Sequence, residues 1–441
     1  MSESQHDASH PSHDEVTITL KARPDRTLIP HSQSVRYIAY QLQVSGQPPT
    51  ARSERSPLTL ALVIDRSGSM AGEKVITAKR AALAVLETLD ERDTASVVVF
   101  DEEIITVQPA ARVTPEVKAQ VRQALSGINA RGSTALHEGW LTGCNTIVSQ
   151  SADMAHSGVA RCFLLTDGQA NVGIVDPEQI ATQAAGVRRN AGIGTSTFGI
   201  GEDYAEELLG PMAEAGGGQF HNLRVSAEIT RAFNGELGEL LLTAATQVRL
   251  EIEAEPGAEV DVLSVYHALP EGDAKHRWSV MIGDLMGGEE RFALAALHFP
   301  VSARREEQAV RARVAWTVDG VERTTDWQTL RFTYATDAEC DAEAADTGVV
   351  HQVGESVSDR AQREALTLSK HGDFAGARAS LGPALKRLTA SAAIDPSLLR
   401  ELQEIEQLDE ELARGPLPSA ISKEAYFQKQ RRSRGQRDYR E

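Results

Sequence analysis

The sequence predicts an α/β fold with a doubly wound, mainly parallel sheet, an antiparallel β-sandwich domain and a helical segment near the carboxyl end. Three observations support this prediction. Between residues 57 and 243, continuous apolar runs alternate with stretches of helical spacing, a pattern typical of parallel strands that are buried on both faces. Between 245 and 335 the apolar residues recur with a period of two, which indicates antiparallel strands. From about 354 to 413 the spacing is helical again.

The first region contains the strands expected to form the parallel sheet. They are TLALVID at 59–65, TASVVVFD at 94–101, RCFLLTD at 161–167, GTSTFGIG at 194–201 and GGGQFHNL at 216–223, with EEIITVQ at 102–108 as a short edge strand. Helices are expected between them at 72–89, 115–126, 135–150, 177–190, 203–215 and 226–243. This alternation is typical of right-handed βαβ units.

The alternating strands at 16–44 have no partners of their own before the α/β region begins. We therefore expect them to join the sandwich, with the α/β domain inserted into it. The predicted division is a disordered polar tail at 1–14, strands of the sandwich at 15–56, the α/β domain at 57–243, the sandwich at 244–336, a linker at 337–353, a helical hairpin at 354–415 and a basic tail at 416–441. A single tetratricopeptide-like unit is the alternative for the hairpin.

Composition excludes several classes of function. The chain has 441 residues and a formal net charge of −18, which disfavours binding to nucleic acids and to anionic membranes. It has no apolar run long enough to span a bilayer, and its amino terminus lacks the features of a secretory signal. Three widely spaced cysteines predict no disulfide framework. We expect a cytoplasmic protein with no membrane insertion.

Polar residues cluster where the expected strands end. Asp65, Ser67 and Ser69 follow the first buried strand. Thr134 lies in a Gly-Ser-Thr loop before a helix, and Asp167 follows a later strand in Thr-Asp-Gly. In an open parallel sheet, ligands bind at the carboxyl ends of the strands. Two carboxylates and three hydroxyls suit Mg²⁺, Mn²⁺ or Ca²⁺ rather than zinc, although each element alone could also be a helix cap or a turn.

These elements, in this order and in this α/β pattern, resemble the von Willebrand factor A domain over residues 57 to 243, including all five elements of its metal-ion-dependent adhesion site. The resemblance implies that Ser67, Ser69 and Thr134 bind the cation directly through their hydroxyls. It implies that Asp65 and Asp167 act through water or change between direct and indirect contact. It also implies that the remaining coordination position accepts an Asp or Glu of a partner protein. Mg²⁺ is the expected ion, with Mn²⁺ or Ca²⁺ as alternatives.

We therefore expect a bacterial-type interaction protein without catalytic activity. Gly68 to Lys74 does not have the spacing of a phosphate-binding loop, and no nucleophile elbow surrounds the two serines. His137 is expected on a helix surface. The alternatives are a scaffold in which the metal is mainly structural, and an accessory subunit of an AAA+ ATPase or chelatase.

The flanking arrangement is similar to that of the inter-alpha-trypsin inhibitor heavy chains, in which an A domain lies within a sandwich. Relatives move the last helix of the A domain when they capture a ligand. Here that helix would be Ala227 to Leu242, and it leads directly into the expected sandwich.

Three histidines in the amino-terminal tail, His6, His10 and His13, could hold a metal, although a solvated tail is the preferred interpretation.

Overall fold

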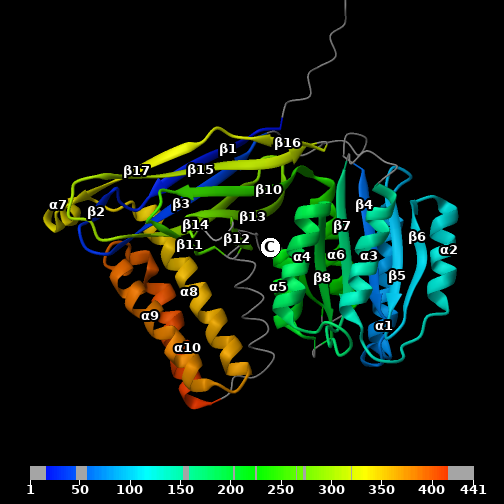
Figure 1. Cartoon of the computed structure of the whole chain (residues 1–441). Helices are drawn as coiled ribbons and strands as arrows, with labels where there is room; N and C mark the ends of the chain where they lie inside the picture. Colours follow the sequence, from blue (N-terminus) through cyan, green and yellow to red (C-terminus); the bar gives the residue numbers. More distant parts are fainter. Residues whose placement is uncertain are drawn as a thin grey trace, which may run out of the picture.

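The computed structural model describes residues 16–45, 57–151, 158–201, 204–223, 226–264, 266–271, 275–318 and 320–415. They form an α/β unit, a two-sheet domain and a bundle of helices (Figure 1). The predictions for the tails at 1–14 and 416–441 lie outside these residues, as does the part of the sequence between 46 and 56. Of the helices that the structure describes, none is both long and apolar enough to cross a membrane.

The α/β unit is built on one sheet of strand order β6-β5-β4-β7-β8-β9, and the predicted fold class is confirmed. All neighbouring strands are parallel except β5 and β6, which form an antiparallel edge. The order reverses between β4 and β7, because the chain first builds outward through β5 and β6 and then returns to the other side. The strands are β4 (Leu58–Asp65), β5 (Thr94–Phe100), β6 (Ile104–Arg112), β7 (Val159–Thr166), β8 (Ile193–Ile200) and β9 (Gly217–Leu223).

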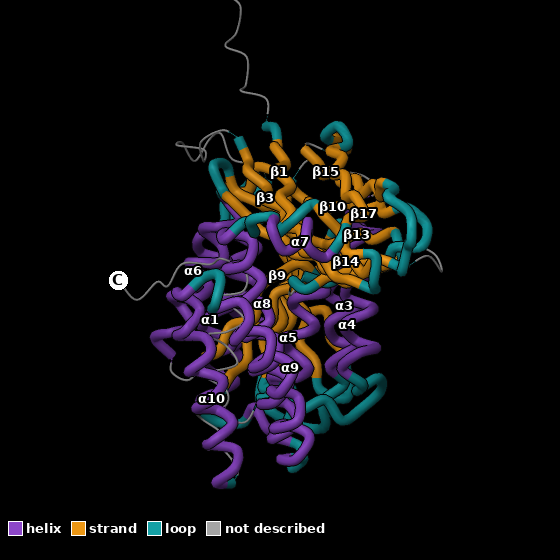
Figure 2. Tube along the Cα trace, turned by 90° about the vertical axis from the view of Figure 1, so that its left-hand side faces the viewer, coloured by secondary structure: helices purple, strands orange, loops and turns teal. Residues whose placement is uncertain are grey.

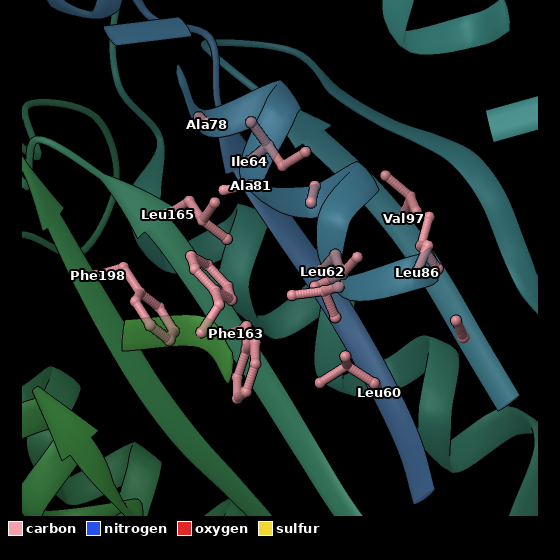
Figure 3. Packing of buried hydrophobic residues seen from close by; sticks show 14 of the residues in the cluster. Leu60, Leu62, Ile64, Ala78, Ala81, Leu86, Val97, Phe163, Leu165 and Phe198 are labelled. Carbon is pink, nitrogen blue, oxygen red and sulfur yellow. The ribbon is translucent and has the colours of Figure 1, made fainter. Parts of the chain in front are cut away.

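Helices cover both faces of this sheet, which explains why its strands are apolar throughout. Along β4, Leu60, Leu62 and Ile64 point into one apolar cluster, while Ala61 and Val63 point into the other. Figure 3 shows the first cluster, where these β4 side chains meet helix α1 and the phenylalanines of β7 and β8. One face is covered by α1 (Glu73–Thr88), α2 (Pro115–Ser126) and α6 (Ser226–Leu241), and the other by α3 (Leu136–Ser151), α4 (Pro177–Ala191) and α5 (Glu206–Ala215).

The two-sheet domain combines strands from before and after the α/β unit. One sheet has the order β1-β3-β14-β11, and the other has the order β12-β13-β10-β15-β17-β2 with β16 paired to β15. A single apolar cluster contains side chains of both sheets, such as Ile38 and Leu250, so the sheets pack face to face. The strands are β1 (Ile18–Pro24), β2 (Leu28–Pro30), β3 (Ser34–Val44), β10 (Thr243–Ala254), β11 (Glu259–Val262), β12 (Ala268–Pro270), β13 (Arg277–Met286), β14 (Glu290–Phe299), β15 (Glu307–Val318), β16 (Val321–Thr324) and β17 (Gln328–Ala335).

The predicted linker at 337–353 is wrong, because most of this segment is helical. Thr336 and Glu339 form a reciprocal capping box that starts α7 (Asp337–Ala342). The Asp346 side chain then accepts a hydrogen bond from the Val349 amide and starts α8 (Thr347–Lys370). Val349 and Val353 are buried against the sheet that contains β3 and β14, so tertiary packing stabilises this first part of α8.

The predicted helical hairpin is also wrong, because three helices pack together after the two sheets. They are α8, α9 (Phe374–Ala392) and α10 (Leu399–Arg414), with a short 3₁₀ turn, η2 (Pro396–Leu398), before the last one. Their apolar side chains form one cluster of their own. Figure 1 shows this bundle below the two-sheet domain and the α/β unit at its right-hand end, and in Figure 2 helices of both lie below the strands of that domain.

A buried ionic cluster joins the α/β unit to the two-sheet domain. Asp284 of β13 forms ion pairs with Arg161 of β7, at 3.0 Å, and with Arg188 of α4. All three side chains are only 4% exposed. The Gln247 amide, in a left-handed conformation with φ 53°, donates a third hydrogen bond to Asp284. Because Arg161 lies near the start of β7, the two-sheet domain contacts the amino-terminal ends of the parallel strands.

We expect Asp284→Asn to lower the free energy of unfolding by about 3 kcal/mol, because two buried guanidinium groups would lose their counter-charge. Urea unfolding followed by circular dichroism measures this change. Glu307→Gln is the matched control, since it breaks the exposed pair with Arg331 in the same domain and should cost less than about 1 kcal/mol. Equal losses in the two variants would contradict a stabilising role for the buried cluster.

Candidate metal centre

The five residues predicted to form a metal site lie at the carboxyl ends of the parallel strands. Asp65 is the last residue of β4, and Asp167 follows the last residue of β7. These two strands are neighbours at the point where the strand order reverses. The connections that leave such neighbouring strands go to opposite faces of the sheet, which leaves a crevice for a ligand. The site therefore lies at the end of the sheet opposite to the buried ionic cluster around Asp284.

The carboxylate of Asp65 is fully buried and held by hydrogen bonds at both oxygens. Its Oδ1 accepts from the Ser67 amide at 2.7 Å, and its Oδ2 accepts from the Thr166 hydroxyl at 2.5 Å. Thr166 is itself fixed, because its Oγ1 accepts from the Gly168 amide at 2.8 Å. Burial raises the pKa of Asp65 to about 6, and the hydrogen bonds from Thr166 and Ser67 lower it in part. At neutral pH this carboxylate is mainly ionised.

The two serines connect this carboxylate to the second one. The hydroxyls of Ser67 and Ser69 are 3.1 Å apart, and the Ser69 hydroxyl donates to Oδ1 of Asp167 at 3.0 Å. Asp167 is fully buried, and its other oxygen accepts from the Lys74 ammonium at 3.0 Å. In an octahedral Mg²⁺ complex with bonds of about 2.0–2.1 Å, neighbouring ligand oxygens are about 2.9 Å apart. The oxygen spacings at the two serines and Asp167 fit such a coordination shell.

Thr134 lies in the loop before α3, and hydrogen bonds attach this loop to the same turn. The Gly68 amide donates to the carbonyl of Gly132 at 3.0 Å, and Gly132 has a φ of +67°, which favours glycine. Thr134 is buried, and its amide donates to Oδ1 of Asn171 at 2.8 Å. Its carbonyl accepts from the amides of Asn171 and Val172. The loop that contains Thr134 is therefore hydrogen-bonded to the turn that contains the two serines. Thr134 itself is hydrogen-bonded to the segment after Asp167.

Two arginines and two acids at the end of the neighbouring strand β5 compensate one another, whereas the exposed Glu102 beside them accepts from the Ser133 amide at 3.4 Å. Arg66 and Arg131 both form ion pairs with Asp101, at 3.1 and 2.8 Å, and both approach Glu103. These two cations and two anions have no net charge. The charge of the centre is therefore set mainly by the groups in direct contact with the predicted ligands.

The donor set fits a hard cation. Within the described ranges, no group of three or more histidine, cysteine, aspartate or glutamate side chains is arranged to hold a metal ion. A cation at this centre would therefore be bound by hydroxyl oxygens together with the two carboxylates, which suits Mg²⁺, Mn²⁺ or Ca²⁺ rather than zinc. Ser67, Ser69 and Thr134 would hold the ion through their hydroxyls, and Asp65 and Asp167 would balance its charge.

The expectation that His137 lies on a helix surface is wrong. His137 is buried on the inner side of α3, with its Nε2 atom 2.6 Å from Oε1 of Gln183 and its ring tilted against Trp140. His137 lies on the face of α3 that packs against α4, where Gln183 is located. The sequence around Thr134 does not indicate this contact, because it joins two distant helices.

Three residues of the centre were not among the predicted ligands. Thr166 orients Asp65, Asn171 holds the Thr134 loop, and Lys74 contacts Asp167. Thr166 could have been identified, since it precedes Asp167 in the same motif. The contacts of Asn171 and Lys74 join segments that are far apart in the sequence, so no local pattern indicates them.

Comparison with known proteins supports the same assignment for the α/β unit. The sequence model of the von Willebrand factor type A domain matches residues 59–234. The uncharacterized protein YfbK of Escherichia coli is 30% identical over 210 residues, which cover 46% of this chain and 35% of that protein. The human inter-alpha-trypsin inhibitor heavy chain H4 is 30% identical over 198 residues, which cover 43% of this chain and 21% of that protein.

Other matches extend beyond the α/β unit. The E3 ubiquitin-protein ligase WAV3 of Arabidopsis thaliana is 27% identical over 302 residues, 62% of this chain and 37% of that protein. A solved structure of a von Willebrand factor type A protein from Catenulispora acidiphila superposes with a TM-score of 0.66 at 21% identity, over 86% of this chain and 87% of the other. That structure shares the fold, whereas the sequence relatives above are matched over little more than a third of their length at most. Residues 59–234, which include the strands and loops that form the candidate metal centre, therefore match the von Willebrand factor type A domain.

Proposed function

We propose that the centre binds Mg²⁺, with Mn²⁺ or Ca²⁺ as alternatives, and uses it to bind an Asp or Glu side chain of a partner protein. The main support is the continuous set of contacts from Asp65 through Ser67 and Ser69 to Asp167. This set joins two fully buried carboxylates through two hydroxyls at the carboxyl ends of β4 and β7. If these residues were only helix caps, a second buried carboxylate, that of Asp167, would not be needed beside them.

The donor types favour capture of an acidic side chain. Hydroxyl ligands are neutral, so they leave the positive charge of the cation available to an incoming anion. The buried carboxylates hold the ion from behind and are themselves held by Thr166 and Lys74. The chain has a net charge of −18, so long-range electrostatics oppose an acidic partner and the attraction must come from the cation at short range.

We propose that the protein is not an enzyme. The Ser67 hydroxyl lies against that of Ser69, which donates to Asp167, and the other oxygen of Asp167 is paired with the Lys74 ammonium. Among the contacts that the structure describes, neither hydroxyl has the histidine partner of an activated serine nucleophile. His137 is engaged with Gln183. WAV3 is named a ligase, but this chain matches only 37% of that protein.

Ser67→Ala should weaken Mn²⁺ binding at least about tenfold, because it removes one of the neutral ligands while leaving the turn intact. Isothermal titration calorimetry on the full chain measures the affinity. Ser126→Ala is the matched control, since Ser126 is an exposed serine at the end of α2 whose hydroxyl bonds only within its own helix. Unchanged Mn²⁺ affinity in Ser67→Ala would contradict the proposed ligand set.

The same variant separates metal-mediated capture from the scaffold alternative. Pull-down with wild type and Ser67→Ala, in Mg²⁺ and in EDTA, should recover the partner only with wild type in Mg²⁺. A partner retained under every condition, together with a lower melting temperature for Ser67→Ala, would favour a scaffold whose metal is structural. Recovery of an AAA+ ATPase in all lanes would favour the accessory-subunit alternative.

Thr166→Val should weaken Mn²⁺ binding by about tenfold to a hundredfold without removing any ligand, because Asp65 would lose the hydrogen bond that orients it. Thr197→Val is the matched control. It removes another buried threonine hydroxyl, on the neighbouring strand β8, which donates to the Leu209 carbonyl. The control should lower thermal stability and leave Mn²⁺ affinity unchanged, and equal metal affinities in the two variants would overturn the role given to Thr166.

A further inference from the structure

Lys74 places a fixed positive charge against the candidate metal centre. Its ammonium lies 3.0 Å from Oδ2 of Asp167, while Oδ1 of the same carboxylate accepts from Ser69. Asp167 is fully buried, and the Lys74 side chain is 26% exposed. The buried carboxylate of Asp167 therefore contacts the Lys74 ammonium through one oxygen and Ser69, a proposed metal ligand, through the other.

Helix stability does not account for this lysine. Lys74 is the second residue of α1, where the helix dipole makes a positive charge unfavourable and an acidic residue favourable. The chain nevertheless makes room for it. A Cβ atom on Gly201, after β8, would lie 2.7 Å from Cε of Lys74, and Gly201 has a φ of +96°. The glycine thus leaves space for the lysine stem on its way to Asp167.

The charges in direct contact at the centre give a simple count. Asp65 and Asp167 contribute two negative charges and Lys74 contributes one positive charge. With a divalent cation the sum is +1, and one partner carboxylate brings it to zero. Without Lys74 the metal-loaded centre would already be neutral, and a carboxylate would have to bind a site with no net attraction for it. At the end of β5, Arg66 and Arg131 balance Asp101 and Glu103, and Glu102 is exposed and contacts the Ser133 amide, so these groups are not among the charges in direct contact.

We propose that Lys74 is a positioning residue that makes the loaded centre selective for a monoanionic carboxylate, at the expense of metal affinity. This inference rests on the proposed function, and it identifies Lys74 as the group that sets the specificity of the metal-loaded centre for its ligand. Two unit charges about 5 Å apart at an effective dielectric constant of about 20 change a binding constant by about two orders of magnitude. Because Lys74 is partly exposed, we expect a change of about tenfold.

The test is Lys74→Gln in the full chain at pH 7.5. Isothermal titration calorimetry should show Mn²⁺ binding about tenfold tighter than in wild type, because the competing ammonium is gone. The Mn²⁺-saturated protein is then titrated with N-acetylglutamate N-methylamide, followed by water-proton relaxation. Binding of this probe should be about tenfold weaker than in wild type. A merely structural lysine would not shift the two affinities in opposite directions.

Two further variants and one further probe serve as controls. Lys79→Gln removes the same charge from the same helix, at a lysine that donates to the Ile128 carbonyl, and should change either affinity less than about twofold. Lys74→Arg keeps the charge and should remain close to wild type, whereas Lys74→Met should reproduce the effects of Lys74→Gln. N-acetylglutamine N-methylamide, which lacks the carboxylate, should not bind any of the proteins detectably.

The possible outcomes distinguish this inference from the proposed function. If wild type binds no Mn²⁺, both are overturned. If wild type binds Mn²⁺ and the glutamate probe, but Lys74→Gln and Lys74→Met shift neither affinity or shift both in the same direction, only the role of Lys74 is overturned. Opposite shifts in both variants, with Lys74→Arg near wild type, support it.

Discussion

The buried negative charge of Asp65 needs hydrogen-bond donors, and the residues that supply them also position the other groups of the centre. Because the group is ionised inside the protein, it needs hydrogen-bond donors at both oxygens. Ser67 supplies one through its amide, which shapes the turn that presents both serine hydroxyls. Thr166 supplies the other and thereby aligns the end of β7, where Asp167 follows. The reversal of strand order between β4 and β7 leaves the space in which these groups meet.

The sequence was sufficient for the features that depend on local patterns. Continuous apolar runs such as residues 59–65 predicted the parallel sheet, because strands covered on both faces need apolar residues at every position. The positions of Asp65 and Asp167 at strand ends predicted which side chains would converge. The start of α8 was missed, because the cap at Asp346 is a single residue and the packing of Val349 on the sheet is a tertiary contact. The pairs Lys74 with Asp167 and Arg161 with Asp284 were missed for the same reason, since they join distant segments.

Helix α6 connects the α/β unit to the two-sheet domain, so it could transmit a conformational change from the metal centre to that domain. Helix α6 ends at Leu241 and β10 begins at Thr243, so a displacement of the helix would act directly on a central strand of the larger sheet. The helix is also fixed to the α/β sheet, because buried Glu236 accepts from Ser196 and contacts His221. A relay through α6, which we propose by connectivity, would have to break these contacts and would therefore be favoured only by a ligand that repays their loss.

The pairing of β3 with β14 has a consequence for biosynthesis. Residues 34–44 leave the ribosome early, but their partner strand at 290–299 is made only after the entire α/β unit has been synthesised. The parallel sheet contains all of its own strands, so it can fold while the two-sheet domain still lacks most of its core. Until then the early strands present an unpaired apolar edge, and a slow or failed insertion would expose the nascent chain to aggregation or chaperone capture at this stage.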